Sequence, residues 1–551
     1  MSESNQTDPG AAIAAQEQAQ HAIRDFLRSR LEAEDGAPPQ QRDTHISVIL
    51  LSGARAFKLK RALRLPYADF STPQLRLAAC EAELHLNRRT APQLYRAVRR
   101  ITREDDGSIA IDGEGALVDA MVEMRRFDEE GLFDRLAARG ELSTGLLDAL
   151  ADAIAAFHEE AEPVADAHGA QRLADVIALN ASSMADLPAL PRETVADLLR
   201  RQEAECTRHA ALLDARAGAG MIRRCHGDLH LRNICLHEER PQLFDCIEFN
   251  ETIATTDTLY DLAFLLMDLR ARAAEDAGLA RAAAHVANRY VDRSRDDAGY
   301  ALLPLFMSLR AAIRAIVAAT QIAEGDDDPA LMRQMQRYLA LAGDLLDPAP
   351  QSLVALGGFS GSGKTTIAEA LSPLIGTPPG ARILESDRLR KHLHGVSPET
   401  PLGPQAYTKE ASQAVYAEMR ARAASVLSAG GSVILEAVHA RPEDRNAATA
   451  IAAEAGCPFH GFWLDVDPVA LEARIAGRGR SASDATRAVL ESQIATGTGP
   501  LDWHRLPPAG EGQAGITAQV EAIVGAVGQG APPSPSDRPG MGRGHGERFE
   551  A

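Results

Sequence analysis

The chain has 551 residues, which is enough for two to four domains at roughly 100–200 residues each. Hydrophobic residues make up 45% and charged residues 25%, proportions that are ordinary for a soluble globular protein. The formal net charge of −19 argues against a broad surface for nucleic acid or for an anionic membrane. It leaves room for a local basic pocket that binds phosphates.

The two ends of the chain differ from the rest in composition. Residues 1–25 are polar without periodicity, and residues 530–551 are rich in Pro, Gly, Ser and Arg, so we expect both to be disordered. The stretch Asp347-Pro348-Ala349-Pro350 separates a helical region from an apolar strand. We therefore expect two folded domains, residues 26–347 and 348–529.

Three features predict a soluble protein of the cytoplasm that binds no membrane. Residues 1–10 contain no basic segment followed by an apolar one. The most apolar helical stretch, 301–320, contains Arg310 and Arg314, so we expect a buried helix there rather than a membrane span. The 6 cysteines form no C-x-x-C pair, which suits a reducing compartment.

The first domain is predicted to begin with a small sheet and to continue with helices. Ser52-Gly53-Ala54 and Asp105-Asp106-Gly107 are turn signals between short apolar runs, and each predicts a hairpin. From Leu142 onward the pattern is mostly helical. This order is typical of an α+β domain. The expected strands are 46–51, 55–60, 97–102, 108–111 and 117–124, with a helix at 73–89.

The segment from His226 to Asn233 carries one group of candidate catalytic residues. Asp228 fits the carboxylate that orients an attacking hydroxyl in phosphoryl transfer. Asn233, five residues on, and Asp245, after the next apolar stretch, fit the oxygen ligands of Mg²⁺. The layout is the H-x-D-x-x-x-x-N and later Asp of protein kinases. A zinc site at His226 and His230 is the weaker alternative, because Gly227 disfavours a helix between them.

This layout resembles the aminoglycoside phosphotransferase and choline-kinase-like family, over about residues 30–345. The resemblance implies a protein-kinase-like fold, in which a strand lysine positions ATP and pairs with a helix glutamate. Lys58, in Ala56-Phe57-Lys58, matches that lysine, and Lys60 on the same strand face is its rival.

The partner of that lysine follows from the faces of the predicted helix 73–89. Leu77, Cys80, Glu81 and Leu84 share one face, so we expect Glu81 rather than Glu83 to point toward the protein. One departure from the family pattern is Ser52-Gly53-Ala54, which is short and lacks the G-x-G-x-x-G of a phosphate-covering loop. Asp261 matches a family position that we interpret as structural support.

The second domain is predicted to be α/β with a parallel sheet, because apolar strands alternate with helical stretches. Residues 358–365 read Gly-Phe-Ser-Gly-Ser-Gly-Lys-Thr, which satisfies G-x-x-x-x-G-K-[ST] between a strand and a helix. Glycines let backbone N–H groups surround a phosphate, and Thr365 is placed to bind Mg²⁺. The expected nucleotide-binding residues are Gly358, Ser360, Gly361, Ser362, Gly363, Lys364, Thr365 and Thr366. The expected strands are 353–356, 382–384, 432–435 and 459–464.

Other candidate residues of this domain follow its strands. Glu436 ends the apolar run 432–435, where it is expected either to hold Mg²⁺ or to contact the substrate. Asp387 lies at the carboxyl end of another strand, where it is expected to accept a proton from a substrate hydroxyl, to cap a helix, or both. Arg478, in a cluster with Arg474 and Arg480, is a candidate for closing over the transferred phosphoryl group.

Over about residues 352–500 the second domain resembles P-loop small-molecule kinases of the gluconate-kinase-like and zeta-toxin-like group. The domain order resembles bacterial fusions of an aminoglycoside-phosphotransferase-like domain with such a P-loop domain. This resemblance implies a bifunctional enzyme that uses ATP and Mg²⁺ to phosphorylate hydroxyl groups of small molecules, with no nucleic-acid partner. Two alternatives stay open: one active kinase with a regulatory P-loop ATPase, and a nucleotide-binding scaffold without catalysis.

Overall fold

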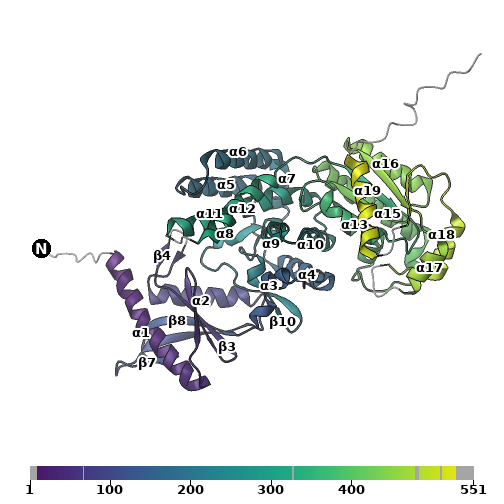
Figure 1. Cartoon of the computed structure of the whole chain (residues 1–551). Helices are drawn as coiled ribbons and strands as arrows, with labels where there is room; N and C mark the ends of the chain where they lie inside the picture. The colour runs from purple at the N-terminus through teal and green to yellow at the C-terminus, as the bar shows by residue number, and fades with distance from the viewer. Residues whose placement is uncertain (1–8, 66–67, 326–327, 478–482, 509–511, 529–551) are drawn as a thin grey trace, which may run out of the picture. The chain divides into compact units, whose positions relative to one another are not determined.

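The computed structural model describes residues 9–65, 68–325, 328–477, 483–508 and 512–528 (Figure 1). Contacts divide the chain into two compact units, Met1–Pro348 and Ala349–Ala551. We describe each unit by itself. The predictions for Arg478 and for the tail 530–551 fall outside the described residues.

The first unit begins with a six-stranded antiparallel sheet in the order β1-β2-β3-β8-β6-β7. The two predicted hairpins are present, and Gly53 and Gly107 at their turns have left-handed φ angles of 53° and 85°. The edge strand β1 was not predicted. The strand bounds are β1 Gln40–Asp43, β2 Ser47–Ser52, β3 Arg55–Lys60, β6 Tyr95–Arg103, β7 Ile109–Ile111 and β8 Ala116–Arg125.

A long helix, α1 (Pro9–Asp35), precedes the sheet, so the prediction of a disordered N-terminus was wrong for residues 9–25. Ile23, Leu27 and Leu31 recur every four residues and are buried against apolar side chains of the sheet. Helix α1 runs alongside that sheet (Figure 1). The side chain of Gln20 donates to Lys60 O at 2.8 Å and accepts from Ala62 N at 2.8 Å. Helix α2 (Pro73–Asn87) packs against β8 and β6.

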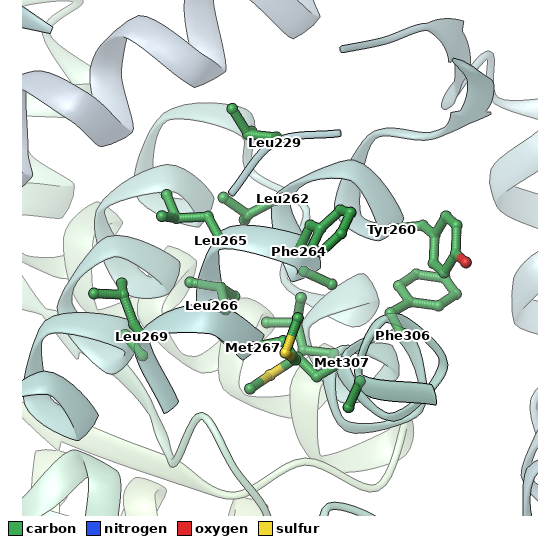
Figure 2. Close-up of a cluster of buried hydrophobic side chains, with 14 of the residues drawn as sticks. Leu229, Tyr260, Leu262, Phe264, Leu265, Leu266, Met267, Leu269, Phe306 and Met307 are labelled. Carbon is green, nitrogen blue, oxygen red and sulfur yellow. The ribbon is translucent and has the colours of Figure 1, made fainter. Parts of the chain in front are cut away.

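The rest of the first unit is mainly helical, as predicted. Its largest apolar core gathers around α9 and α11, and Leu229 of the loop that precedes Asn233 belongs to the same cluster (Figure 2). This anchoring fixes the loop on a rigid base. The helices are α3 Phe133–Ala138, α4 Thr144–Glu160, α5 Gly169–Ala185, α6 Arg192–Arg208, α7 Ala210–Gly218, α8 Glu251–Ala254, α9 Thr258–Arg272, α10 Gly278–Ser294, α11 Leu303–Ala323 and α12 Pro329–Asp344. The short strands are β4 Arg64–Leu65, β5 Ala68–Asp69, β9 Ile222–Arg224, β10 Ile234–His237, β11 Arg240–Leu243 and β12 Thr255–Asp257.

One helical segment, Ala298–Ala323, is long and apolar enough by composition to cross a membrane. However, 67% of its most apolar window is buried inside the fold. Arg310 on this segment is buried too, and its guanidinium lies 3.9 Å from the ring centroid of Tyr260. The burial is that of a core helix of the first unit.

The second unit has a five-stranded parallel sheet in the order β14-β15-β13-β16-β17, with helices on both faces. Helices α15 and α16 cover one face, while α13 and α19 cover the other. This arrangement confirms the predicted α/β fold and adds the strand β17. The strands are β13 Leu353–Gly357, β14 Arg382–Glu385, β15 Val433–Glu436, β16 Phe459–Leu464 and β17 His504–Leu506. The helices are α13 Lys364–Leu371, α14 Ser386–Leu393, α15 Lys409–Ser428, α16 Pro442–Ala455, α17 Pro468–Ala476, α18 Arg487–Thr496 and α19 Gly512–Gly528.

Candidate active sites

In the first unit, the loop between β9 and β10 brings Asp228 and Asn233 into contact. Asn233 Nδ2 donates to Asp228 O at 2.9 Å and to Asp228 Oδ2 at 3.0 Å. Within the described chain, Asn233 Oδ1 accepts no hydrogen bond, so this amide oxygen remains for a cation. The Asp228 side chain is 37% exposed, which leaves it accessible to a small molecule.

Asp228 remains ionised in this environment. Burial by itself would raise the pKa of Asp228, but the nearby His230, His226 and Arg314 hold it well below its usual range. An ionised carboxylate accepts a hydrogen bond from a hydroxyl group and so orients its oxygen for attack.

Asp261 on α9 supports the backbone of this loop, as the family resemblance implies. Its carboxylate accepts hydrogen bonds from His226 N at 3.2 Å and from Gly227 N at 2.7 Å. Gly227 has a φ of 85°, and a Cβ there would lie 3.1 Å from side chains of Ile247 and Ala254. A larger residue at position 227 would therefore displace the loop that carries Asp228.

Asp245 follows β11 and is held between the same loop and the sheet. His226 Nε2 contacts Phe244 O at 2.9 Å, and Asp245 N donates to the Tyr95 hydroxyl at 3.1 Å. Asp245 has a left-handed φ of 65°, an uncommon conformation for a residue other than glycine. Its Oδ1 accepts from Lys58 Nζ. Lys58 of the sheet and Asp245 after β11, two of the predicted site residues, are thus in direct contact.

The glutamate that pairs with Lys58 is Glu83, and the prediction of Glu81 was wrong. Glu83 Oε1 lies 2.9 Å from Lys58 Nζ, and Oε2 lies 2.6 Å from Lys60 Nζ, whereas Glu81 is exposed. Lys60 also pairs with Glu248, which sequence reasoning did not single out. Burial alone would raise the pKa of Glu83, but the charges of Lys58 and Lys60 lower it to about 2. Both lysines therefore share one buried carboxylate.

Replacing Glu83 with glutamine is expected to destabilise the first unit by about 3 kcal/mol, because it leaves two buried lysines with fewer counter-charges. Glu81→Gln, at an exposed position on the same helix, is the matched control and should change stability by less than about 0.5 kcal/mol. The 2 tryptophans, Trp463 and Trp503, both lie in the second unit. Circular dichroism during heating should therefore show that the first unit of Glu83→Gln unfolds at a lower temperature. The unfolding transition of the second unit, followed by tryptophan fluorescence, should stay unchanged. Equal effects of the two variants would contradict this pairing.

The turn Ser52-Gly53-Ala54, where the family resemblance predicts the phosphate-covering loop, is tied to the end of α1. Ser52 Oγ donates to Asp35 Oδ2 at 2.5 Å, and Arg55 Nη2 lies 3.3 Å from the same oxygen. A Cβ at Gly53 would lie 3.2 Å from the Asp35 carboxyl group. The turn that lacks the glycine-rich pattern of a phosphate-covering loop is therefore held by contacts with Asp35 of α1.

In the second unit, residues 358–365 form a tight loop between β13 and α13. Gly358, Gly361 and Gly363 have φ angles of 148°, 87° and 96°, which suit glycine alone. Lys364 Nζ donates to Gly358 O at 2.9 Å and to Phe359 O at 3.2 Å, so the lysine folds back over the loop. Ser362 Oγ is buried and has no hydrogen-bond partner in the part of the chain that the structure describes. This unmet polar atom and the glycine cradle fit a bound phosphate.

Glu436 ends β15 beside this loop. Thr365 Oγ1 donates to Glu436 Oε2 at 3.3 Å, and Lys364 Nζ lies 3.9 Å from Glu436 Oε1. Burial raises the pKa of Glu436, against the opposing effect of Lys364. A buried carboxylate next to Thr365 fits a cation at this position, since Mg²⁺ prefers oxygen ligands.

Asp387 lies near Glu436, because the strands β14 and β15 that precede them pair in register at Glu385 and Glu436. Asp387 lies in the first turn of α14, whose capping residue is Glu385. Its half-buried carboxylate makes no hydrogen bond or ion pair with the residues described, so it is available to a substrate. The helix-cap alternative for Asp387 is thus wrong.

Arg474 and Gln493, polar side chains of later helices, hydrogen-bond to the loop. Arg474 Nη1 lies 3.4 Å from Gly361 O and from Ser362 O. Gln493 on α18, which sequence reasoning missed, accepts from Ser360 N and donates to Ser360 Oγ, both at 3.0 Å. No motif marks Gln493, because its contact joins residues 133 positions apart. Thr366 is exposed on α13.

Comparisons with known proteins agree with this division of the chain. A model of the phosphotransferase enzyme family matches residues 54–298, and a model described as AAA domain matches residues 353–500. Uncharacterized proteins of Mycobacterium tuberculosis and Mycobacterium bovis are 29% identical over 481 residues, which cover 85% of this chain and 92% of the relatives.

Solved structures resemble one unit each. A choline/ethanolamine kinase family protein from Mesorhizobium loti covers 59% of this chain and 95% of its own, with 14% identity and a TM-score of 0.38. A gluconokinase from Sinorhizobium meliloti covers 33% of this chain and 96% of its own, with 21% identity and a TM-score of 0.25. The chain therefore joins a domain that matches the phosphotransferase enzyme family to a P-loop domain that matches the AAA domain model.

Proposed function

We propose that this chain is a bifunctional ATP-dependent phosphotransferase, in which each unit transfers the γ-phosphoryl group of ATP to a hydroxyl group of a small molecule. The observation that carries the proposal is that each unit combines a nucleotide-binding constellation with an accessible carboxylate. In the first unit this carboxylate is Asp228, and in the second it is Asp387. We further propose that the enzyme acts in the cytoplasm, with neither a membrane nor a nucleic acid as partner.

In the first unit, Lys58 positions the ATP phosphates, while Asn233 and Asp245 hold Mg²⁺. Bound Mg·ATP supplies the γ-phosphoryl group and the charge neutralisation that its transfer needs. Asp228 orients the acceptor hydroxyl and takes its proton. Glu83 holds Lys58 in place together with Asp245.

In the second unit, the loop 358–365 holds the phosphates with backbone N–H groups, helped by the N-terminus of α13. Thr365 and Glu436 hold Mg²⁺ between them. Asp387 faces the acceptor, because its carboxylate has no partner among the described residues and lies at the carboxyl end of the sheet.

Glu436→Gln keeps the shape of the side chain and removes its charge. If Glu436 holds the metal, the variant should need at least about tenfold more Mg²⁺ for half-maximal turnover at the second site, and its ATP affinity should fall in parallel. Titrations of turnover with Mg²⁺ at fixed ATP measure this. A drop in turnover with an unchanged Mg²⁺ requirement would assign Glu436 to the acceptor instead, and wild-type behaviour in both measurements would remove it from the site.

The proposal is tested by measuring ATP consumption of the full chain against panels of sugars, amino alcohols and nucleosides. Four proteins are compared: wild type, Asp228→Ala, Lys364→Ala and the double variant. We expect each single variant to lose the response to one set of acceptors, and the double variant to lose both. If Lys364→Ala changes nothing except the regulation of the first site, the second unit is a regulatory ATPase. Responses that survive in the double variant would refute the proposal.

A further inference from the structure

The helical part of the first unit contains a hollow of about 150 Å³ next to the loop that carries Asp228. Its walls come from that loop and from α9, α11 and α12, with one further residue after α9. The lining side chains are polar or aromatic, and none is aliphatic. They are His230, Arg232, Asp268, Arg272, Glu275, Arg314, Gln334, Arg337 and Tyr338.

Two contacts connect this hollow to the catalytic loop. His230 lines the hollow, and its Nε2 lies 3.4 Å from Asp228 Oδ2. Asp268 of α9, which also lines the hollow, accepts a hydrogen bond from Leu231 N at 3.1 Å. A molecule in the hollow therefore lies against His230, the neighbour of the carboxylate that we propose as the acceptor of the hydroxyl proton.

The charge of the lining is positive, because four arginines stand against two carboxylates. Both carboxylates are already engaged. Asp268 accepts from Leu231 N and lies 3.4 Å from Arg272 Nε, while Glu275 Oε1 lies 2.6 Å from Arg337 Nη1. Arg232 Nε lies 3.5 Å from Asp134 Oδ2, a carboxylate outside the lining, so Arg314 is the lining arginine that remains for a ligand.

Arg314 is the lining arginine whose donors are not taken up by a carboxylate. It is half-buried on α11, with its guanidinium 5.7 Å from the ring centroid of Tyr338, and it forms no ion pair with any carboxylate of the described residues. Its charge lowers the pKa of Asp228 from a distance, but its N–H groups remain available to an anion that enters the hollow. His230 provides a second, independent sign: the residue is 9% exposed, and its Nδ1 is buried with no hydrogen-bond partner in the described chain.

We propose that this hollow is the acceptor site of the first unit, and that the acceptor is a small hydrophilic hydroxyl compound whose carboxylate or phosphate group is bound by Arg314. This inference rests on the proposed function of the first unit and names its substrate class. Arginine matches the bidentate geometry of both anionic groups, and the cationic lining disfavours amine acceptors. The absence of aliphatic lining disfavours lipids.

The transfer balances without a further reactant. The acceptor oxygen forms a bond to the γ-phosphorus of ATP as the bond from that phosphorus to the β,γ-bridging oxygen breaks. Asp228 takes the hydroxyl proton and later releases it to water. The products are a phosphate ester, ADP and a proton.

The test uses the full chain carrying Lys364→Ala, so that ATP consumption reports the first site. Three matched sets of acceptors are compared: neutral polyols (glycerol, glucose), hydroxycarboxylates (glycerate, gluconate) and phosphate monoesters (glycerol 3-phosphate, glucose 6-phosphate). Amines (ethanolamine, glucosamine) form a fourth set. We expect turnover with one of the two anionic sets, and which of them responds distinguishes the carboxylate from the phosphate.

Arg314→Gln should then raise KM for the anionic acceptor by about 10- to 100-fold, with a much smaller change in kcat, because one charge-assisted contact in binding is lost. Arg314→Lys should recover part of this loss. Arg281→Gln, at an exposed arginine of α10 outside the hollow, is the control and should match the parent. Calorimetric titration with the same anionic compounds, without ATP, measures binding independently of turnover.

Two results would overturn the anionic site while leaving the first unit a kinase. The first is turnover with neutral polyols or amines only. The second is an Arg314→Gln variant that binds and phosphorylates the anionic acceptor like the parent. Anion binding that is lost in Arg314→Gln, without turnover of any acceptor, would support the anionic site and refute the proposed kinase function. If the protein neither binds nor phosphorylates any of the anionic compounds, the inference is overturned.

Discussion

Replacing Asp228 with alanine is expected to lower phosphotransfer by the first unit about 10²- to 10⁴-fold, because the variant loses the carboxylate that orients the acceptor hydroxyl and takes its proton. The affinity for ATP should stay nearly unchanged, since Lys58, Asn233 and Asp245 remain in place. The fold should persist as well, because Asn233 still donates to the backbone carbonyl of residue 228.

The measurement is acceptor-dependent ATP consumption in the Lys364→Ala background. Asp186→Ala, at an exposed position at the end of α5, is the control for a loss of surface charge. Asp245→Ala should differ from Asp228→Ala by weakening Mg·ATP binding as well. Wild-type turnover in Asp228→Ala would exclude the kinase-like chemistry proposed for this unit.

Replacing Lys364 with alanine is expected to weaken nucleotide binding by the second unit by about 2–5 kcal/mol, an affinity loss of at least about 30-fold. The ammonium group lies in a buried loop where no other described lysine is placed to substitute for it. Turnover by the second unit should fall with binding, while the first unit keeps its activity.

Intrinsic fluorescence reports this binding selectively. Both tryptophans lie in the second unit, and the ring centroid of Trp463 is 5.4 Å from that of Phe359 in the phosphate loop. Titration with Mg·ATP should change the emission of the wild type and of Lys409→Ala, a control at an exposed lysine. An unchanged response in Lys364→Ala would show that this loop does not bind the nucleotide.

The sequence predicts best those parts of the sites that are contiguous along the chain. The loop 358–365 and the segment from Asp228 to Asn233 are short strings whose residue types are dictated by phosphate and Mg²⁺ chemistry. The strands next to them can be predicted equally well, because apolar runs that alternate with turn residues are local sequence signals. The predicted fold class of both units follows from these local patterns.

The wrong assignment of Glu81 shows where local reasoning ends. The apolar side chains of Leu77 and Leu84 predict that their face of α2 points toward the protein interior. The buried residues of α2 are instead Arg76, Cys80, Glu83 and Asn87. Three of these are polar, and their partners come from distant strands and loops: Asp119 for Arg76, Lys58 and Lys60 for Glu83, and Cys246 N for Asn87. Only the tertiary fold supplies such partners.

Helix α1 and the basic hollow differ in how far the sequence could predict them. The spacing of Ile23, Leu27 and Leu31 is a helical signal that identifies α1 in retrospect, although the polar residues around it suggested disorder. The basic hollow has no such signal. Arg272, Arg314 and Arg337 lie on or next to three different helices, and nothing in their spacing brings them together.

We propose that the chain holds two independent sites for Mg·ATP. Calorimetric titration of the full chain with a non-hydrolysable ATP analogue in the presence of Mg²⁺ counts these sites directly. We expect two sites per chain in the wild type, one in Lys364→Ala, and none in the double variant Lys364→Ala with Asp245→Ala. A single site in the wild type would contradict the proposal of two sites.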